Sequence, residues 1–198
     1  MATEVTQGLY FAVKGTNPSR FTECGPDCPV EYVSWDDAIS FANKLSKKQG
    51  LKPCYTFDKG DVVWDIQTCS GWRLPTEAEW EYMARGGKET LYAGGTAIDK
   101  LGWIKSNSED QTHPVAQKKP NAYGLYDMSG NVFEWVWDNY GNYTEVAENP
   151  LGPKNGSERV CRGGGWNLGA KFARASRRMH DDPSMKSGFV GFRLVRKN

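Results

Sequence analysis

Two segments of the chain place apolar side chains on one helical face, and each has its own start signal. The first contains four such residues, namely Ala38, Phe41, Ala42 and Leu45. Ser34 precedes them as a capping residue, and Asp37 is placed to bond back to the cap. In the second segment Thr76 and Glu79 have the spacing of a capping box, and Gly86 ends the pattern. These signals predict one helix after residue 34 and another after residue 76.

The remaining apolar residues fall in short stretches that are typical of strands. Five stretches have this character, at residues 4–12, 30–33, 132–136, 159–162 and 191–195. Residues 88–122 show little periodicity and predict a long surface loop. Because three strands follow the helices instead of alternating with them, we expect an α+β fold: two helices, a small antiparallel sheet and long loops. The length of 198 residues predicts a single domain over 1–198.

Composition and charge exclude several classes of partner. The formal net charge is +1, which gives no electrostatic case for nucleic acid or for an anionic membrane. The chain contains no apolar run of the roughly 20 residues that a membrane-spanning helix needs. Its first ten residues show no secretory signal pattern. We therefore expect neither nucleic-acid binding nor direct membrane insertion by this chain.

Cysteine and histidine usage limits the chemistry. The five cysteines are Cys24, Cys28, Cys54, Cys69 and Cys161. Cys24 and Cys28 are placed to close a small loop, and Cys54 and Cys69 flank a hairpin-like stretch, but free thiols fit the sequence equally well. The chain has only two histidines, and no second cysteine pair stands at metal-ligand spacing. Zinc binding and a Ser-His-Asp triad are therefore disfavoured.

Several longer motifs resemble one known family. They lie at residues 30–38 (VEYVSWDDA), 71–82 (GWRLPTEAEWEY), 121–135 (NAYGLYDMSGNVFEW), 162–166 (RGGGW) and 191–194 (GFRL). Together they resemble the formylglycine-generating-enzyme, or sulfatase-modifying-factor, domain over about residues 4–196. The resemblance implies a C-type-lectin-like fold.

The resemblance also implies what a catalytic member would need. Enzymes of this family oxidise a substrate cysteine with a copper-binding cysteine pair placed shortly after the strand that carries R-G-G-S-W. Here residues 166–174 (WNLGAKFAR) contain no cysteine, and Leu168 stands near the position of the first thiol. Copper(I) prefers soft thiolate ligands, which leucine, lysine and phenylalanine cannot supply. Related iron-dependent sulfoxide synthases need a histidine cluster. We therefore expect a chain that is not an enzyme and that binds no copper.

A non-catalytic branch of the family fits the C-terminal part better. Residues 162–194 resemble the variable region of the variable proteins of diversity-generating retroelements, which use this fold to display a changing ligand surface. The resemblance assigns to the scaffold Trp166, Asn167, Ala170, Ala173, Arg174, Ser176, Arg178, Pro183, Gly191, Phe192 and Arg193. It assigns to a ligand-binding variable face Leu168, Gly169, Lys171, Phe172, Arg177, Met179, His180, Asp181, Asp182, Met185 and Ser187. The resemblance implies a retroelement-diversified display protein, exposed at the cell surface or outside the cytoplasm, that binds a partner, expected to be a protein.

Other interpretations stay open at this point. Phe172 and Met179 would be ordinary core residues, and His180 a solvated loop residue, if the segment served only the fold. The chain would alternatively be an oxidase of the formylglycine-generating type with altered ligands, or a carbohydrate-binding lectin-like module.

Residues 127–134 (DMSGNVFE) are a candidate calcium loop. The resemblance places ligands at the Asp127 side chain, the Gly130 and Val132 carbonyls and the Glu134 carboxylate, and oxygen ligands suit a hard cation such as calcium. The alternative is a Gly-Asn turn in which Glu134 pairs with an arginine.

Overall fold

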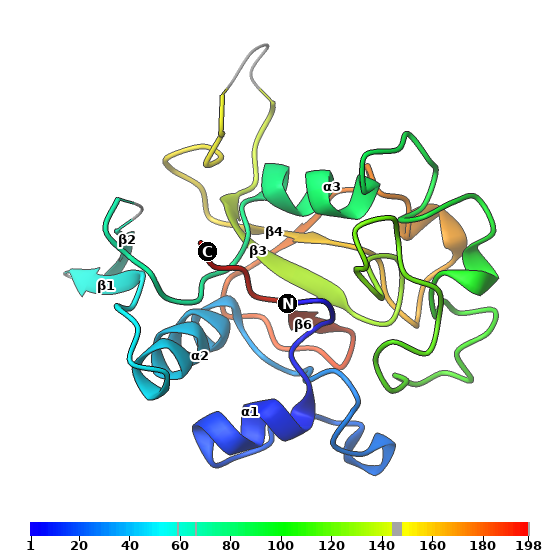
Figure 1. Ribbon diagram of the computed structural model, residues 1–198, viewed down its shortest axis with the longest axis horizontal. Helices are drawn as coiled ribbons and strands as arrows, with labels where there is room; N and C mark the ends of the chain where they lie inside the picture. The colour runs from blue at the N-terminus through cyan, green and yellow to red at the C-terminus, as the bar shows by residue number, and fades with distance from the viewer. Residues whose placement is uncertain (59, 66, 144–147, 198) are drawn as a thin grey trace.

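A four-stranded sheet lies at the centre of the fold (Figure 1). The computed structural model describes residues 1–58, 60–65, 67–143 and 148–197. The strands are β3 (Phe133–Asn139), β4 (Arg159–Arg162), β5 (Met179–Asp181) and β6 (Val190–Phe192), in the order β5-β4-β3-β6. β3 pairs antiparallel with β4 and β4 with β5, but β6 runs parallel to β3. The expected small antiparallel sheet therefore holds for β3, β4 and β5, whereas β6 departs from it because the chain crosses from β5 at one edge to β6 at the other.

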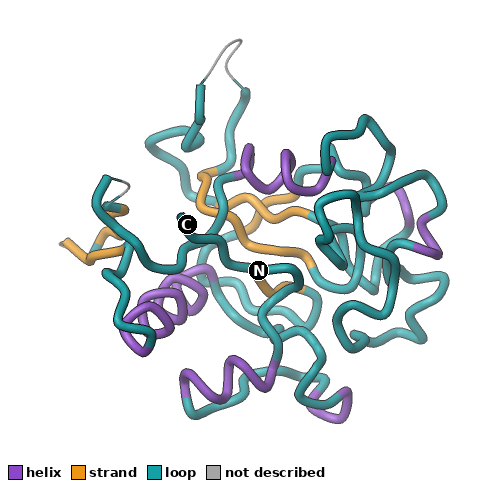
Figure 2. The backbone as a smooth tube through the Cα atoms, viewed as in Figure 1, coloured by secondary structure: helices purple, strands orange, loops and turns teal. Residues whose placement is uncertain are grey.

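Helices cover the sheet from two sides (Figure 1). α3 (Glu77–Arg85) packs on β3 and β4, while α1 (Gln7–Lys14) and α2 (Trp35–Lys48) pack against each other on the other side of the sheet. The two predicted helices are confirmed, since Ser34 and Asp37 form one capping box and Thr76 and Glu79 form another. Long loops make up much of the remaining chain (Figure 2).

The prediction of a strand over residues 4–12 was wrong, because α1 forms there. The Thr6 side chain accepts a hydrogen bond from the Leu9 amide, and Gly15 ends the helix in a left-handed conformation. Local capping thus overrides the alternation of side chains. Residues 30–33 form no strand either, although the amide of Val30 donates to the carbonyl of Val5 at 2.8 Å. The chain therefore carries a third helix beside the two that were expected.

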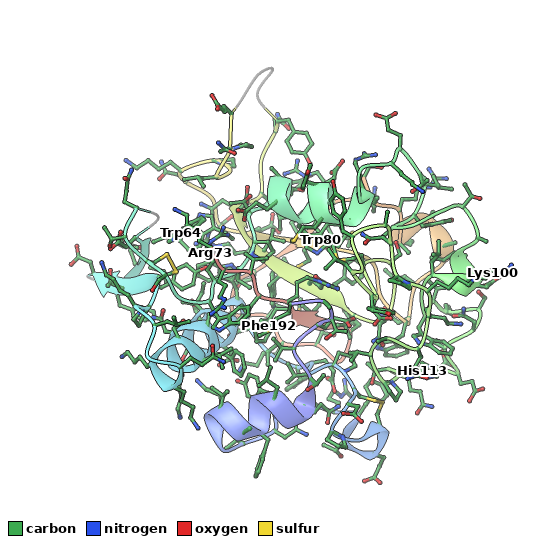
Figure 3. All side chains as sticks on the ribbon, viewed as in Figure 1. Trp64, Arg73, Trp80, Lys100, His113 and Phe192 are labelled. Carbon is green, nitrogen blue, oxygen red and sulfur yellow. A yellow bond between two sulfur atoms is a disulfide. The ribbon has the colours of Figure 1, made fainter. Side chains whose placement is uncertain are left out.

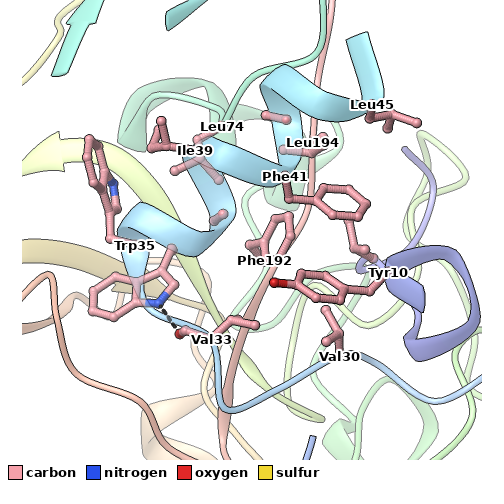
Figure 4. Packing of buried hydrophobic residues seen from close by; sticks show 14 of the residues in the cluster. Tyr10, Val30, Val33, Trp35, Ile39, Phe41, Leu45, Leu74, Phe192 and Leu194 are labelled. Carbon is pink, nitrogen blue, oxygen red and sulfur yellow. Dashed lines mark hydrogen bonds between the residues drawn. The ribbon is translucent and has the colours of Figure 1, made fainter. Parts of the chain in front are cut away.

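Aromatic side chains hold the main core between α1, α2 and the sheet (Figure 4). Tyr10 of α1 stacks on Phe41 of α2, with ring centroids 5.0 Å apart. Phe41 in turn meets Phe192 of β6 edge to face at 5.4 Å. These contacts are the arrangement that aromatic rings prefer, and they fix both helices to the sheet.

Two disulfides and a hairpin complete the framework. Cys24 bonds to Cys28, and Cys54 bonds to Cys69. The second bridge brackets the hairpin of β1 (Tyr55–Asp58) and β2 (Asp61–Trp64). Cys161 on β4 is free and buried. Within the part of the chain that the structure describes, no helix is both long enough and apolar enough to cross a bilayer.

Asp138 on β3 gives the fold a pH dependence. Its Oδ2 atom accepts a hydrogen bond from the Glu77 amide at the start of α3, at 2.7 Å. Burial raises the pKa of Asp138 from 3.8 to about 7, against the lowering effect of that hydrogen bond. The unfolded chain therefore releases this proton near its ordinary pKa and the folded chain only near neutrality. Stability falls as the pH rises between these two values.

We predict that Asp138→Asn removes the fall in stability at high pH, while its side-chain oxygen still accepts a hydrogen bond from the Glu77 amide. The variant should raise the free energy of unfolding by about 1–3 kcal/mol near pH 8 and leave it unchanged near pH 4. Urea denaturation at both pH values measures the effect. An equal change at both would show that the Asp138 carboxylate is not the titrating group.

Candidate functional site

A glycine-rich turn leads the chain from β4 into the segment that carries the predicted variable face. Gly164 has a φ of +80°, and a Cβ atom there would lie 2.8 Å from the Cα of Ala173. Only glycine therefore fits this turn. The Trp166 indole donates to the carbonyl of Gly188 at 2.8 Å, which ties the start of the segment to its end. The segment is thus a closed loop on a fixed base.

Buried side chains beneath the segment hold its middle. Arg162 donates to Glu77 at 2.9 Å and to the carbonyl of Ala175 at 2.7 Å. Arg178 also donates to Glu77, through Nε at 2.7 Å and Nη2 at 2.8 Å. Both guanidinium groups therefore converge on one carboxylate at the start of α3, which anchors the segment on either side of residue 175.

All eleven residues predicted for the variable face reach the solvent. Five are exposed: Gly169, Lys171, Arg177, His180 and Asp182. Six are half-buried: Leu168, Phe172, Met179, Asp181, Met185 and Ser187. Leu168, Met179 and Met185 rest one side on the main core. Neither Phe172 nor Met179 is a fully buried core residue, so both are accessible to a ligand.

The residues assigned to the scaffold differ in burial. Ala173, Gly191, Phe192 and Arg193 are buried. Arg174 and Ser176, assigned to the scaffold by resemblance, are exposed instead. Buried Ala173 and Ala175 alternate with these two residues. The alternation of small and polar side chains along 173–176 is the sequence signal that matches their exposure.

The face has two parts. Lys171, Phe172, Arg174, Ser176 and Arg177 surround a cavity of about 410 Å³, which we call the cationic pocket. Its base is the short 3-10 helix Ala170–Phe172 (η3) with its neighbour Ala173, packed against the long loop through a cluster that contains Ala173, Tyr92, Leu101 and Ile104. The expected surface loop over 88–122 therefore supports the face.

The second part follows β5, an edge strand that the sequence did not indicate. His180 on this strand stacks on Tyr140 with centroids 3.8 Å apart, and its Nδ1 atom lies 3.0 Å from Glu158. It is therefore not a solvated loop residue. Further along, Lys186 pairs with Asp37 of α2 at 2.7 Å, which places residues 182–187 beside the start of that helix.

The candidate calcium residues are arranged differently from a cation site. Both Glu134 oxygens accept from the Arg193 guanidinium at 2.6 Å, and the Trp80 indole donates to Glu134 at 2.7 Å. Glu134 and Arg193 are each 0% exposed. A calcium ion at Glu134 would face this buried guanidinium and the repulsion of its like charge. The structure therefore shows Glu134 paired with an arginine, which is the alternative that the sequence left open.

Asp127 is bonded within the protein through one of its two carboxylate oxygens. The Asp127 Oδ2 atom accepts from the Ala116 amide at 2.7 Å, while Oδ1 has no hydrogen-bond partner. Burial raises the pKa of Asp127 to about 6. The Gly130 amide donates to the carbonyl of Gly163 at 2.8 Å, and Val132 is buried. Among the residues described, no three His, Cys, Asp or Glu side chains form a group that could hold a metal ion.

Comparison with known proteins decides the family. The model of the sulfatase-modifying factor enzyme 1-like domain matches residues 1–198. The chain belongs to this family. Chaperone protein LppX of Paenibacillus barcinonensis is 36% identical to it over 98% of the chain and 78% of that protein. The formylglycine-generating enzyme of Bos taurus is 31% identical over 94% of the chain, which spans half of that enzyme's length.

A solved structure shows the same fold. Treponema denticola variable protein 1 superposes with a TM-score of 0.91 and 39% identity, over 98% of the chain and 82% of that protein. CarF superposes with a TM-score of 0.78 and 30% identity, over 99% of the chain and 84% of that protein. The predicted resemblance and the α+β fold of this sulfatase-modifying-factor domain are therefore confirmed.

Two glycines of the C-terminal segment test the difference between a position on the variable face and a position in the scaffold. A Cβ atom on Gly169 meets nothing within 4 Å, whereas one on Gly191 would lie 2.3 Å from the Val30 carbonyl oxygen. We predict that Gly169→Asn changes the free energy of unfolding by less than about 0.5 kcal/mol. Gly191→Ala should lower it by about 2–3 kcal/mol. Urea denaturation measures both, and similar losses would mean that position 169 belongs to the scaffold.

We also predict that calcium leaves this domain unchanged. Because Arg193 already neutralises Glu134, millimolar calcium should shift the melting temperature by less than about 1 °C relative to a chelator. Differential scanning calorimetry with Glu134→Gln as a comparison checks this. A calcium-dependent rise of several degrees in the unmodified chain, absent from the variant, would establish the ligand set.

Proposed function

We propose that this chain is a non-catalytic binding module whose variable face contacts a protein partner. The observation that carries the proposal is that all eleven face residues, five exposed and six half-buried, reach the solvent above a tightly bonded base. Such a surface accepts changes in side chain without changes in the fold. The match to Treponema denticola variable protein 1 supports this interpretation.

The sulfur atoms of the chain support a non-catalytic role. Four of the five cysteines are bonded in two disulfides. The fifth, Cys161, is 3% exposed, and burial raises the pKa of its thiol well above the ordinary value. Thiols of this kind are inert. Leu168 stands where the family resemblance expects the first copper-binding thiol, so the chain lacks the paired thiolates that this oxidation requires.

The residue types on the face suit a protein partner. Phe172, Met179 and Met185 offer adaptable apolar contacts, and Arg177 and His180 offer hydrogen bonds. Large apolar and arginine side chains are enriched in the energetic centres of protein interfaces. Because the base is fixed by buried ion pairs, little backbone order has to be gained on binding. The similarity to a protein named a chaperone agrees with a protein ligand.

Diversification by a retroelement and an extracytoplasmic location form part of the same proposal. A Cβ atom added at Gly169 meets no atom within 4 Å, and this open space suits a position subject to replacement. Two disulfides in one domain are typical of proteins that fold in an oxidising compartment. The first feature favours a diversified display protein, and the second favours action outside the cytoplasm.

A library experiment tests the display role. The eleven face positions are randomised in one library. A matched library randomises eleven exposed or half-buried positions on α1 and α2, and both libraries are selected against the same purified protein. We predict that most face variants keep the melting temperature of the unmodified chain and that binders arise far more often from the face library. The reason is that the face gathers its positions on one segment held by the ion pairs of Arg162 and Arg178 with Glu77.

Two outcomes would contradict the proposal. Unfolding of most face variants, or equal yields from the two libraries, would reject the display role. Copper-dependent oxidation of a cysteine-containing peptide to an aldehyde, followed by mass spectrometry, would show that the chain is an enzyme after all.

A further inference from the structure

Two cations lie near one aromatic ring in the cationic pocket, and a third cation lines the same cavity. The Lys171 Nζ atom lies 5.0 Å from the centroid of the Phe172 ring, and the Arg177 Cζ atom lies 5.4 Å from it. Arg174 lines the same cavity of about 410 Å³ and is exposed. Phe172 itself is half-buried, so part of its ring faces the cavity. The pocket therefore combines positive charge with an apolar floor.

None of these three cations has an ion-pair partner among the residues that the structure describes. Five other arginines do pair with a glutamate: Arg73, Arg85, Arg162, Arg178 and Arg193. The chain as a whole is nearly neutral, with a formal net charge of +1. The positive charge of the pocket is thus local and uncompensated, and an anion brought to it would complete the missing pairs.

We propose that the partner presents an acidic protein segment to this pocket, with carboxylates flanking an apolar side chain. This proposal rests on the proposed function and names the chemistry of its ligand. Two arginine guanidinium groups favour bidentate contact with carboxylates, and the Phe172 ring provides an apolar contact between them. Nucleic acid is the less favoured ligand, because three cations on a nearly neutral chain release few counterions from a phosphate backbone.

Arg174 gains a role from this arrangement. The family resemblance gave it to the scaffold, yet its side chain makes no hydrogen bond or ion pair within the described chain, and it lines the pocket. A residue kept for the fold would contact the fold. The structure therefore assigns Arg174 to ligand recognition together with Lys171 and Arg177.

Selection from a random peptide library tests the proposal without a known partner. Phage-displayed peptides are selected on the immobilised chain and on two triple variants. The pocket variant carries Lys171→Gln, Arg174→Gln and Arg177→Gln. The control variant carries Lys44→Gln, Lys47→Gln and Lys88→Gln, which changes three exposed lysines outside the pocket. Both lose the same three positive charges, so a general charge effect would act equally on both.

We expect the unmodified chain and the control variant to enrich peptides with several Asp or Glu residues around an apolar one. The pocket variant should lose this preference. Measured by fluorescence polarisation, the best acidic peptide should bind the pocket variant about tenfold more weakly and the control variant within about twofold. The affinity should also fall as salt is added. A charge-keeping variant with Lys171→Arg, Arg174→Lys and Arg177→Lys should keep the acidic preference.

Several results would overturn the proposal. Peptides without acidic enrichment, or equal acidic enrichment on the pocket variant, would remove the pocket as an acid-binding site. An oligonucleotide that binds more tightly than the acidic peptides would assign the pocket to nucleic acid. These results would not by themselves reject the display role. If the face library yields binders whose affinity does not depend on the three pocket cations, the display role stands and only the acidic ligand is rejected.

Discussion

One buried ion pair organises the structure. Glu134 on β3 accepts two hydrogen bonds from Arg193, just after β6, and a third from the Trp80 indole of α3. Figure 3 shows Trp80 between its helix and the sheet. Three elements therefore meet at a single carboxylate. Removing either charge would leave the other buried and unpaired, which costs about 3–5 kcal/mol. The same pair occupies the oxygens that a calcium ion would need, so the frame of this domain is held by a guanidinium.

A second carboxylate repeats the arrangement beneath the variable face. Glu77 joins Arg162 of β4 to Arg178, just before β5, and so fixes both ends of the stretch between them. The ion pairs that hold the segment then lie beneath the face, while Lys171, Arg174 and Arg177 at the surface make no ion pair among the residues that the structure describes. This separation is the physical condition for a surface whose chemistry changes without loss of the fold. It also explains how an unpaired group of cations is tolerated around Phe172, since their charge stays in water.

The sequence-based predictions were accurate where the interaction joins residues close together in the chain. Capping by Ser34 and Thr76 was predictable because donor and acceptor lie three residues apart. The strand over 159–162 was also predicted with its bounds. The helix in place of a strand after Thr6 was missed because a single cap and Gly15 outweighed the side-chain pattern. The exposure of Arg174 was missed because the family resemblance assigned it to the scaffold. The small residues Ala173 and Ala175 on either side of it were not taken into account.

By itself the sequence determined the family, the two capped helices and the absence of a cysteine after Gly165, because residue identity and local hydrogen bonding do not change on folding. The tertiary structure alone decided that Glu134 meets Arg193, 59 positions away, and that four cysteines pair. It also decided which cations stay unpaired at the surface. The reason is that burial and charge pairing depend on neighbours in space, which only the packed chain brings together.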